Sequence, residues 1–438
     1  MKKLIKNVHV LTMDAEKTEY PNGYIMIADN MIDAVGSMEH APDEKAIEEI
    51  VDGKQAIAMP GMVNTHTHIG MIPFRSLGDD YPDRLRRFLF PLEQECMTEE
   101  LAYHSGKYAI AEMQLAGVTT FMDMYYFEDA LAQATDEMGS RAILGETVID
   151  FPTCDADTAH GGLDYAQSFI PKWLNHELIT PAIAPHAPNT NSPEALKEAV
   201  RLSEQYQIPL TMHVAEMDYE LDHFRDTLDM TSVEFLDSVG ALSERLVAAH
   251  CIHLTDQDID LLKKHHVKVA HCIGANTKSA KGVARISDLL DKQIPLGLGT
   301  DGPSSGNTLD LFTQMKLFAN FHKTELKDRG AFPASEIVEL ATMGGAKVLG
   351  MENQIGSLES GKKADIVLVE TRSANMFPLF DPYAALVYSA NAGNVQDVFI
   401  NGKRTVKDKV LMDQRVAELR QNLAEQMKEF TVKAKERL

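Results

Sequence analysis

The 438-residue sequence contains only four cysteines and comparatively little positive charge. The cysteines are scattered and none forms a C-x-x-C pair, which argues against a disulfide framework and against a thiolate zinc site. Lys and Arg number 42 against 65 Asp and Glu, so the net charge is −23. This charge repels polyanions and argues against a nucleic-acid-binding or anionic-membrane surface. A small neutral or cationic substrate fits better.

Long apolar runs are also missing. No stretch has the length of a transmembrane helix, and no signal-peptide segment follows the charged start Met1–Ile5. With no disulfide framework expected, these features predict a cytoplasmic protein. Hydrophobic residues still make up 44 % of the chain, which is enough for a large core.

The sequence does contain a regular alternation of short apolar runs and longer stretches of helical periodicity, between residues 58 and 353. The runs predict strands at 58–64, 118–124, 141–147, 180–186, 208–214, 246–251, 267–271 and 295–301. Eight strands that alternate with helices predict a parallel (β/α)₈ TIM-like barrel, whose functional groups gather at the C-terminal ends of the strands. We expect residues 58–353 to form this catalytic domain.

Both ends of the chain carry a different pattern. Short strands are expected at residues 4–11, 23–28, 32–35, 364–369 and 395–400. Because isolated strands with an apolar face need partners, segments 1–57 and 354–438 are expected to build one small β-sandwich. Asn401-Gly402 predicts a hairpin turn, and apolar residues spaced by three or four over 412–437 predict a docked terminal helix.

Histidines gather where the predicted strands end. His66 and His68 follow the first strand, and side chains at i and i+2 of a strand share a face, so both can reach one metal ion. An isolated pair of this kind is equally compatible with two polar loop residues. Later strand ends add His186, His213 with Glu216, His250, His271 and Asp301. So many histidines at strand ends favour the metal site.

The predicted ligands are His66, His68, His213 and Asp301, which offer three neutral nitrogens and one carboxylate to a divalent ion. A position remains for water, and such a site lowers the pKa of that water. The fourth strand has no lysine at its end that, once carboxylated, could bridge two ions, so one metal ion is expected. Zinc is the first choice and iron the second.

Neighbouring groups are suited to proton transfer. Glu216 can protonate a ring nitrogen of the substrate and later the departing amine, His250 can orient the water, and Asp301 can accept its proton. His186 and His271 can hydrogen-bond the substrate. Structural alternatives remain for each: the histidines can be buried core residues, and Glu216 can be a solvated residue at a helix start.

Four segments together resemble the amidohydrolase superfamily: Pro60–His68, His213–Glu216, Ala249–Leu254 and Gly299–Gly302. Within it they are similar to the aminohydrolase branch that contains methylthioadenosine/S-adenosylhomocysteine deaminases and triazine hydrolases. Gly356–Val367 extends the resemblance over nearly the whole chain. It implies the same four ligands, and hydrolytic removal of an amine from a purine, nucleoside, pterin or similar heterocycle by attack of a metal-bound hydroxide on the ring carbon.

The resemblance also implies that Glu93 binds ribose hydroxyls and that the protein is a homo-oligomer. The sequence departs from the family pattern in two places. Glu146 stands near the end of the third strand, where adenosylhomocysteine deaminases carry an arginine, and a carboxylate there would repel the substrate's carboxylate. The segment after the seventh strand lacks the usual Asn-Pro step but keeps Asn276. Segment 70–96 is expected to shape the pocket mouth.

Two other functions stay open. One is displacement of a different leaving group, such as chloride from a triazine, although Glu216 favours an amine, which must be protonated as it leaves. The other is a non-catalytic scaffold on the same fold, which would be expected to lose ligands that this sequence keeps. The H-x-E and P-C-x-x-C pattern of nucleic-acid deaminases is absent.

Overall fold

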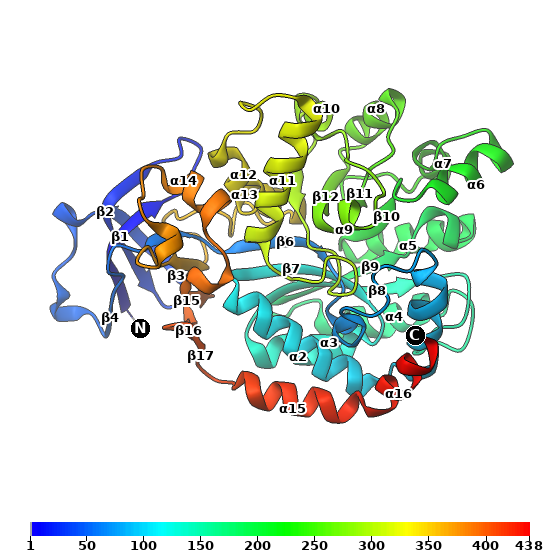
Figure 1. Cartoon of the computed structure of the whole chain (residues 1–438), viewed down its shortest axis with the longest axis horizontal. Helices are drawn as coiled ribbons and strands as arrows, with labels where there is room; N and C mark the ends of the chain where they lie inside the picture. Colours follow the sequence, from blue (N-terminus) through cyan, green and yellow to red (C-terminus); the bar gives the residue numbers. More distant parts are fainter. Residues whose placement is uncertain (1) are drawn as a thin grey trace. The chain divides into compact units, whose positions relative to one another are not determined.

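The computed structural model describes residues 2–438, which divide into two compact units (Figure 1). The first consists of residues up to Asn64 with 111–120 and 310–415, and the second of 65–110, 121–309 and 416–438. Within residues 2–438, none of the helices combines the length and the apolar composition needed to span a membrane.

The first unit contains a nine-stranded sheet to which both ends of the chain contribute. Its strands are β1 (Lys2–Leu11), β2 (Glu19–Ala28), β3 (Met31–Ser37), β4 (Glu49–Asp52), β5 (Ile57–Pro60), β14 (Ile366–Val369), β15 (Val395–Ile400), β16 (Lys403–Lys407) and β17 (Val410–Leu411). Strand β14 pairs antiparallel with β5, so the predicted joining of the two chain ends is confirmed. Asn401 and Gly402 have φ of 50° and 75°, as a tight hairpin turn requires.

The eight strands of the second sheet follow one another in chain order. They are β6 (Met62–Thr67), β7 (Val118–Tyr125), β8 (Arg141–Val148), β9 (Ile179–Pro185), β10 (Leu210–Val214), β11 (Leu246–His250), β12 (Lys268–His271) and β13 (Leu296–Leu298). Their ladders from β8 to β13 are parallel. Every residue of β7 and β8 is buried, as expected for parallel strands covered on both faces. The (β/α)₈ prediction is confirmed.

The α-helices of residues 2–438 come in the following order, and those from α1 to α10 lie between barrel strands. They are α1 (Phe90–Cys96), α2 (Glu99–Leu115), α3 (Glu128–Met138), α4 (Gly162–Trp173), α5 (Pro193–Tyr206), α6 (Asp218–Leu228), α7 (Ser232–Ser238), α8 (Asp256–Lys264), α9 (Ile273–Lys278), α10 (Ile286–Asp291), α11 (Leu311–Leu326), α12 (Ala334–Leu340), α13 (Met343–Leu349), α14 (Pro382–Ala384), α15 (Val416–Gln426) and α16 (Lys428–Arg437). The local sequence determines where several of these helices begin. Ser192 caps the N-terminus of α5 ahead of Pro193, and Thr255 forms a capping box with Asp258 at the N-terminus of α8.

The first predicted barrel strand, 58–64, is in fact parts of two strands. Pro60-Gly61 separates β5, in the nine-stranded sheet, from β6, in the barrel. Gly61 is required there because a Cβ atom would lie 2.1 Å from Thr119 Oγ1. The barrel strand therefore extends to Thr67, and His66 lies inside it.

The predicted terminal helix is divided at Met427 into α15 and α16. Phe430 of α16 packs edge to face on Phe74, with ring centroids 4.7 Å apart, and Arg437 forms an ion pair with Glu95. Helix α16 therefore supports the segment between β6 and α2 from its outer side.

Candidate metal centre

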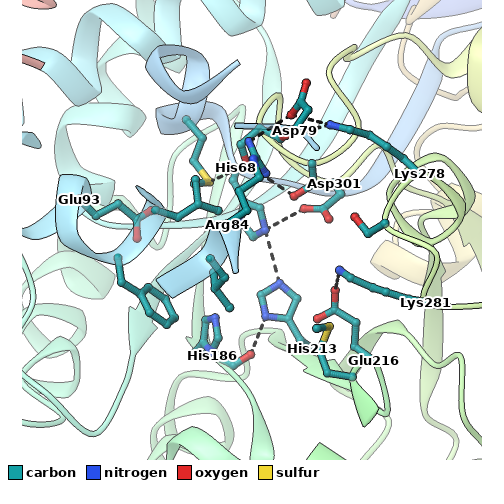
Figure 2. Close-up of a pocket in the computed structure, with 18 of the residues that line it drawn as sticks. His68, Asp79, Arg84, Glu93, His186, His213, Glu216, Lys278, Lys281 and Asp301 are labelled. Atoms are coloured by element: carbon teal, nitrogen blue, oxygen red, sulfur yellow. Dashed lines mark hydrogen bonds and ion pairs between the residues drawn. The ribbon is translucent and has the colours of Figure 1, made fainter. Parts of the chain in front are cut away.

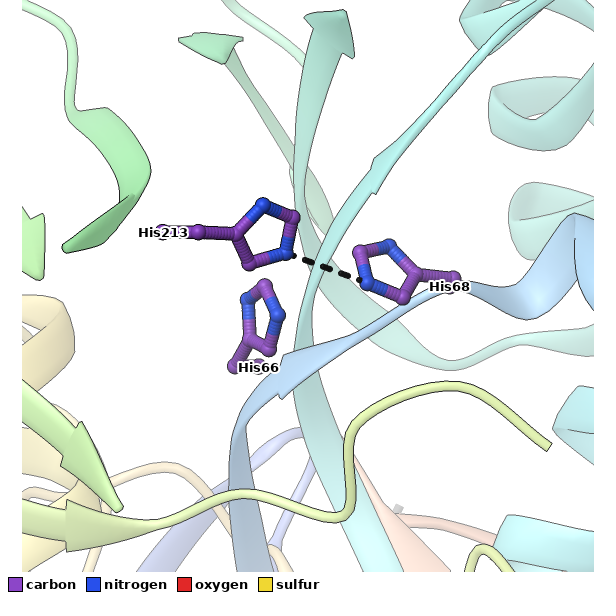
Figure 3. A group of neighbouring side chains, drawn as sticks. All are labelled: His66, His68 and His213. Atoms are coloured by element: carbon purple, nitrogen blue, oxygen red, sulfur yellow. Dashed lines mark hydrogen bonds between the residues drawn. The ribbon is translucent and has the colours of Figure 1, made fainter. Parts of the chain in front are cut away.

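The four predicted ligands converge where β6, β10 and β13 end. One ring nitrogen from each of His66, His68 and His213 lies within 4.8 Å of the other two (Figure 3). His68 Nε2 is 3.4 Å from His213 Nε2 and 3.1 Å from Asp301 Oδ1. The backbone N–H of Asp301 donates to the carbonyl oxygen of His66 at 3.0 Å, which joins the first and last barrel strands at this point.

Backbone carbonyls orient two of the ligands. His68 Nδ1 lies 2.6 Å from the carbonyl oxygen of Met124, and His213 Nδ1 lies 2.7 Å from that of His186. Because a carbonyl only accepts, Nδ1 carries the proton in each ring and Nε2 presents its lone pair to the centre when the ring is neutral.

The donor set fits a divalent ion. His66 is fully buried, and neither of its ring nitrogens has a hydrogen-bond partner among the described residues. A buried polar group without a partner is costly, and a bound cation would satisfy one of these nitrogens. Burial holds the pKa of His66 and His213 well below its usual range, so both are in the neutral form that binds a metal.

Asp301 remains a carboxylate despite its burial. Burial alone would raise its pKa, but the hydrogen bond and charge of His68 outweigh this and hold the pKa well below its usual range. The same pairing raises the pKa of His68 to about 9 against the opposing effect of burial. The centre therefore offers three imidazoles and one carboxylate once a metal ion takes the place of the Nε2 proton of His68.

A second group lies beside the ligands. Glu216 Oε1 is 3.5 Å from His250 Nε2, and one ligand atom from each of Glu216, His250 and Asp301 falls within 4.8 Å of the others. The ring of His250 is held by Asn276, whose Oδ1 lies 2.8 Å from His250 Nδ1. The backbone N–H of Glu216 donates to the Glu220 carboxylate at 3.0 Å. The predicted proton-transfer residues therefore lie next to the metal ligands.

The backbone turns sharply where these groups leave their strands. Ala215, His250, Cys251 and Asp301 have φ of 49°, 71°, 48° and 58°, values that residues with a side chain seldom adopt. Such conformations persist only where the surroundings enforce them, and they cluster at functional sites.

A cavity of about 470 Å³ opens beside the centre. Its lining includes His68, His213, Glu216, Asp301 and Glu93, together with apolar residues such as Phe90 (Figure 2). Residues of segment 70–96 line it from Met71 to Glu93, as expected for the pocket mouth. The size and mixed lining suit a drug-sized organic molecule.

Comparison with known proteins agrees with this geometry. The model of the Amidohydrolase family matches residues 57–405. The chain belongs to the amidohydrolase family. It is 38% identical to 5-methylthioadenosine/S-adenosylhomocysteine deaminase 1 of Syntrophus aciditrophicus, over 97% of this chain and 98% of that one.

Another relative of this amidohydrolase is the 5-methylthioadenosine/S-adenosylhomocysteine deaminase of Syntrophobacter fumaroxidans, with 36% identity over 95% of each chain. Among solved structures, an adenosine deaminase from Xanthomonas campestris with bound zinc superposes with a TM-score of 0.95 at 31% identity, covering 98% of both chains.

Three of the predicted substrate-binding residues of this amidohydrolase line the cavity: Glu216, described above, Glu93 and His186. Glu93 of α1 accepts a hydrogen bond from the Tyr125 hydroxyl at 3.0 Å. His186 follows β9 and packs its ring on His213 at a centroid distance of 4.9 Å. Burial lowers the pKa of His186 to about 4, so its ring is neutral. Both side chains can reach a bound molecule.

Two other residues lie elsewhere. His271, the last residue of β12, is fully buried and does not line the cavity, so its role in substrate binding stays a prediction. Glu146 of β8 was expected to face the substrate, but it does not line the cavity either, and its carboxyl accepts a hydrogen bond from the backbone N–H of Glu128 at 3.3 Å. Side chains alternate along a strand, and Thr147 lines the cavity instead.

One prominent residue of the cavity was not predicted from the sequence. Lys281, in the segment after α9, lines the cavity and donates a hydrogen bond from Nζ to Glu216 Oε1 (Figure 2). A lone lysine in a loop carries no motif and no periodicity, so only the folded structure brings it to Glu216.

Proposed function

We propose that this amidohydrolase is a zinc-dependent deaminase of an adenosine-type nucleoside or a related amino-substituted heterocycle. The observation that carries the proposal is the convergence of Glu216, His250 and Asp301 beside the histidine ligands, in one cavity with Glu93. The printed names of the relatives, methylthioadenosine/S-adenosylhomocysteine deaminase and zinc-bound adenosine deaminase, support it.

The reaction replaces an exocyclic amine by oxygen from water. The water oxygen bonds to the ring carbon, the adjacent ring nitrogen takes up a proton, and the C–N bond then breaks so that ammonia leaves. His66, His68, His213 and Asp301 would hold a zinc ion, which when bound acts as a Lewis acid and lowers the pKa of water.

The proton transfers fall to three side chains. Asp301 accepts a proton from the water. The Nδ1–H group of His250 donates a hydrogen bond to Asn276 Oδ1, so Nε2 faces Glu216 and orients the water beside it. Glu216, a carboxylate at rest, takes up the two protons of the attacking water in turn, one of them by way of Asp301. It delivers the first to the ring nitrogen and the second to the departing amine, because an amine is a poor leaving group until it is protonated.

Glu93 and His186 position the substrate in this proposal. The Glu93 carboxylate accepts hydrogen bonds from ribose hydroxyls. The Tyr125 hydroxyl donates a hydrogen bond to the same carboxylate and holds it in place. The neutral ring of His186 contacts the base, since it packs directly on the ligand His213.

The test is a panel of substrates offered to zinc-loaded protein: adenosine, methylthioadenosine, adenosylhomocysteine, guanine, a pterin and a chlorotriazine. We expect stoichiometric ammonia release from at least one adenine nucleoside, with the absorbance change of its deamination. Release of chloride without ammonia would support the triazine alternative instead. No product from any compound, with zinc bound at one ion per chain, would overturn the proposal.

Two further expectations, a homo-oligomer and a cytoplasmic location, are open to test. The homo-oligomer is tested by light scattering of the purified chain, where the mass of a monomer at micromolar concentration would contradict it. The cytoplasmic location is tested by fractionation of the cells that make the protein.

A further inference from the structure

The proposed mechanism gives no role to Lys281, which forms an ion pair with Glu216 in the cavity. We propose that Lys281 is a positioning residue for Glu216, whose ammonium group fixes the carboxylate so that one oxygen meets the ring nitrogen of the substrate. This inference rests on the proposed function and assigns a further residue to the same reaction.

The contacts of the Glu216 carboxylate with Lys281 and His250 fall on one of its two oxygens, Oε1. Lys281 Nζ donates to Oε1, and His250 Nε2 lies 3.5 Å from the same atom. Both partners of the ion pair are well enclosed, with side-chain exposures of 16% and 15%. Oε2 is therefore the oxygen left for a substrate. Without a partner on Oε1 the glutamate side chain would sample several rotamers.

The backbone around Lys281 is built to direct it toward Glu216. Ala280 and Gly282 on either side have φ of 55° and 127°, and a Cβ atom at position 282 would lie 3.0 Å from Ile252 Cγ2. The backbone N–H of Lys281 donates to the carbonyl oxygen of Asn276 at 2.9 Å. The side chain of Asn276 holds His250, so one helix end fixes both neighbours of Glu216.

The other cations of the cavity have different partners. Lys278 lies 2.9 Å from Asp79 Oδ1, and Arg84 lies 3.5 Å from the same carboxylate oxygen. These contacts join segments at the rim. Of these three cations, only Lys281 forms its ion pair with Glu216, the acid that carries the substrate's proton. An enclosed ion pair contributes little net stability, so stability alone does not explain this lysine.

The expected effect follows from where the pair acts. Lys281 holds a group that contacts the reacting ring, whereas binding of the sugar depends on Glu93. Loss of the ammonium group should therefore lower kcat far more than it raises KM. Misplacement of a catalytic group by about 1 Å costs on the order of 100-fold in rate.

The experiment compares Lys281→Met, Lys281→Arg and Lys281→Ala in the zinc-loaded full chain, with a substrate that the wild type deaminates. We expect Lys281→Met to lose about 100-fold in kcat with KM within about twofold, and Lys281→Arg to retain most of the activity. Added ethylammonium should restore part of the kcat of Lys281→Ala. The control is Lys292→Met, an exposed lysine 2.7 Å from Asp260, which should leave activity and zinc content unchanged.

Three results would overturn the inference: full activity of Lys281→Met, loss of zinc from it, or equal loss in the arginine variant with no rescue by ethylammonium. If the wild type deaminates nothing, the proposed function fails, and crystal structures of the zinc-loaded wild type and Lys281→Met decide the positioning separately. A Glu216 carboxylate in the same conformation in both would overturn the inference, and a displaced one in the variant would support it.

Discussion

Two buried glutamates of one cavity differ in protonation because their neighbours differ. Burial raises the pKa of both Glu216 and Glu93. At Glu216 the charges of His250 and Lys281 outweigh burial and hold the pKa well below its usual range. At Glu93 the hydrogen bond from Tyr125 offsets burial only in part, and the pKa is raised to about 7. Glu216 is thus a carboxylate at neutral pH, whereas Glu93 titrates there.

Replacement of Glu216 by glutamine removes the proton carrier but preserves the shape of the side chain. We expect kcat to fall by about 10²–10⁴-fold, the usual contribution of a general acid–base group. Zinc content, measured by elemental analysis, should not change, because Glu216 is not among the four ligands. A variant that keeps wild-type kcat would rule out this role.

Glu93 gives the enzyme a pH dependence of substrate binding. Its carboxyl is protonated in the folded protein below a pKa of about 7, against an ordinary value of 4.5. Ribose hydroxyls donate to the ionised form, so KM for a nucleoside should fall as pH rises through about 7. The raised pKa also means that the contribution of Glu93 to folding stability falls as pH rises from its ordinary pKa of 4.5 to about 7.

Steady-state kinetics between about pH 6 and pH 8 measure this effect. The matched variant is Glu93→Gln, in which KM should be higher and should no longer vary with pH in this range. A wild-type KM that is flat across the range would contradict the role of Glu93.

At the scale of the elements, glycines let β13 approach β6. A Cβ atom on Gly302 would lie 3.0 Å from His68 Cβ and 3.1 Å from its Cδ2. Gly302→Ala should therefore displace His68 and weaken zinc binding by about 10–100-fold, as disturbances of ligand orientation do. Titration against a competing chelator measures the affinity.

The control for that variant is Gly330→Ala, because a Cβ atom there meets only Asp328 Oδ1, at 3.3 Å. It should bind zinc as the wild type does. Unchanged zinc affinity in Gly302→Ala would show that the centre adapts to the added methyl group.

Elements buried on both faces were the easiest to predict. The barrel strands are continuous apolar runs with histidines at their ends, and these histidines led to the predicted ligands of the candidate site. Strand 58–64 was misjudged because periodicity cannot show that Pro60-Gly61 passes the chain from one sheet to the next. The positions of Glu146 and Lys281 could not be predicted from the sequence. For Glu146, a shift of one residue along a strand turns the side chain to the other face. For Lys281, the positive φ angles of Ala280 and Gly282 direct the side chain toward Glu216.

For the molecule as a whole, the metal centre is expected to couple activity to stability. A ligand that binds only the folded state stabilises it, by about 2.7 kcal/mol when its free concentration is 100 times Kd. Removing zinc with a chelator should abolish deamination and lower Tm, and added zinc should restore both. Calorimetry of the two forms measures the shift. An identical Tm with and without zinc would contradict the coupling.

The contact between Asp301 and His66 has a consequence for the order of events in unfolding. His66 lies in β6 and Asp301 follows β13, so the contact joins the two ends of the barrel sheet, and with His68 these residues make up three of the four predicted ligands. A metal ion there would link the first and last strands of the barrel, whose other neighbouring strands are joined by backbone hydrogen bonds. Unfolding of the metal-free protein is therefore expected to begin between β6 and β13. A non-catalytic descendant that had lost these ligands would need other contacts to hold the first and last barrel strands together.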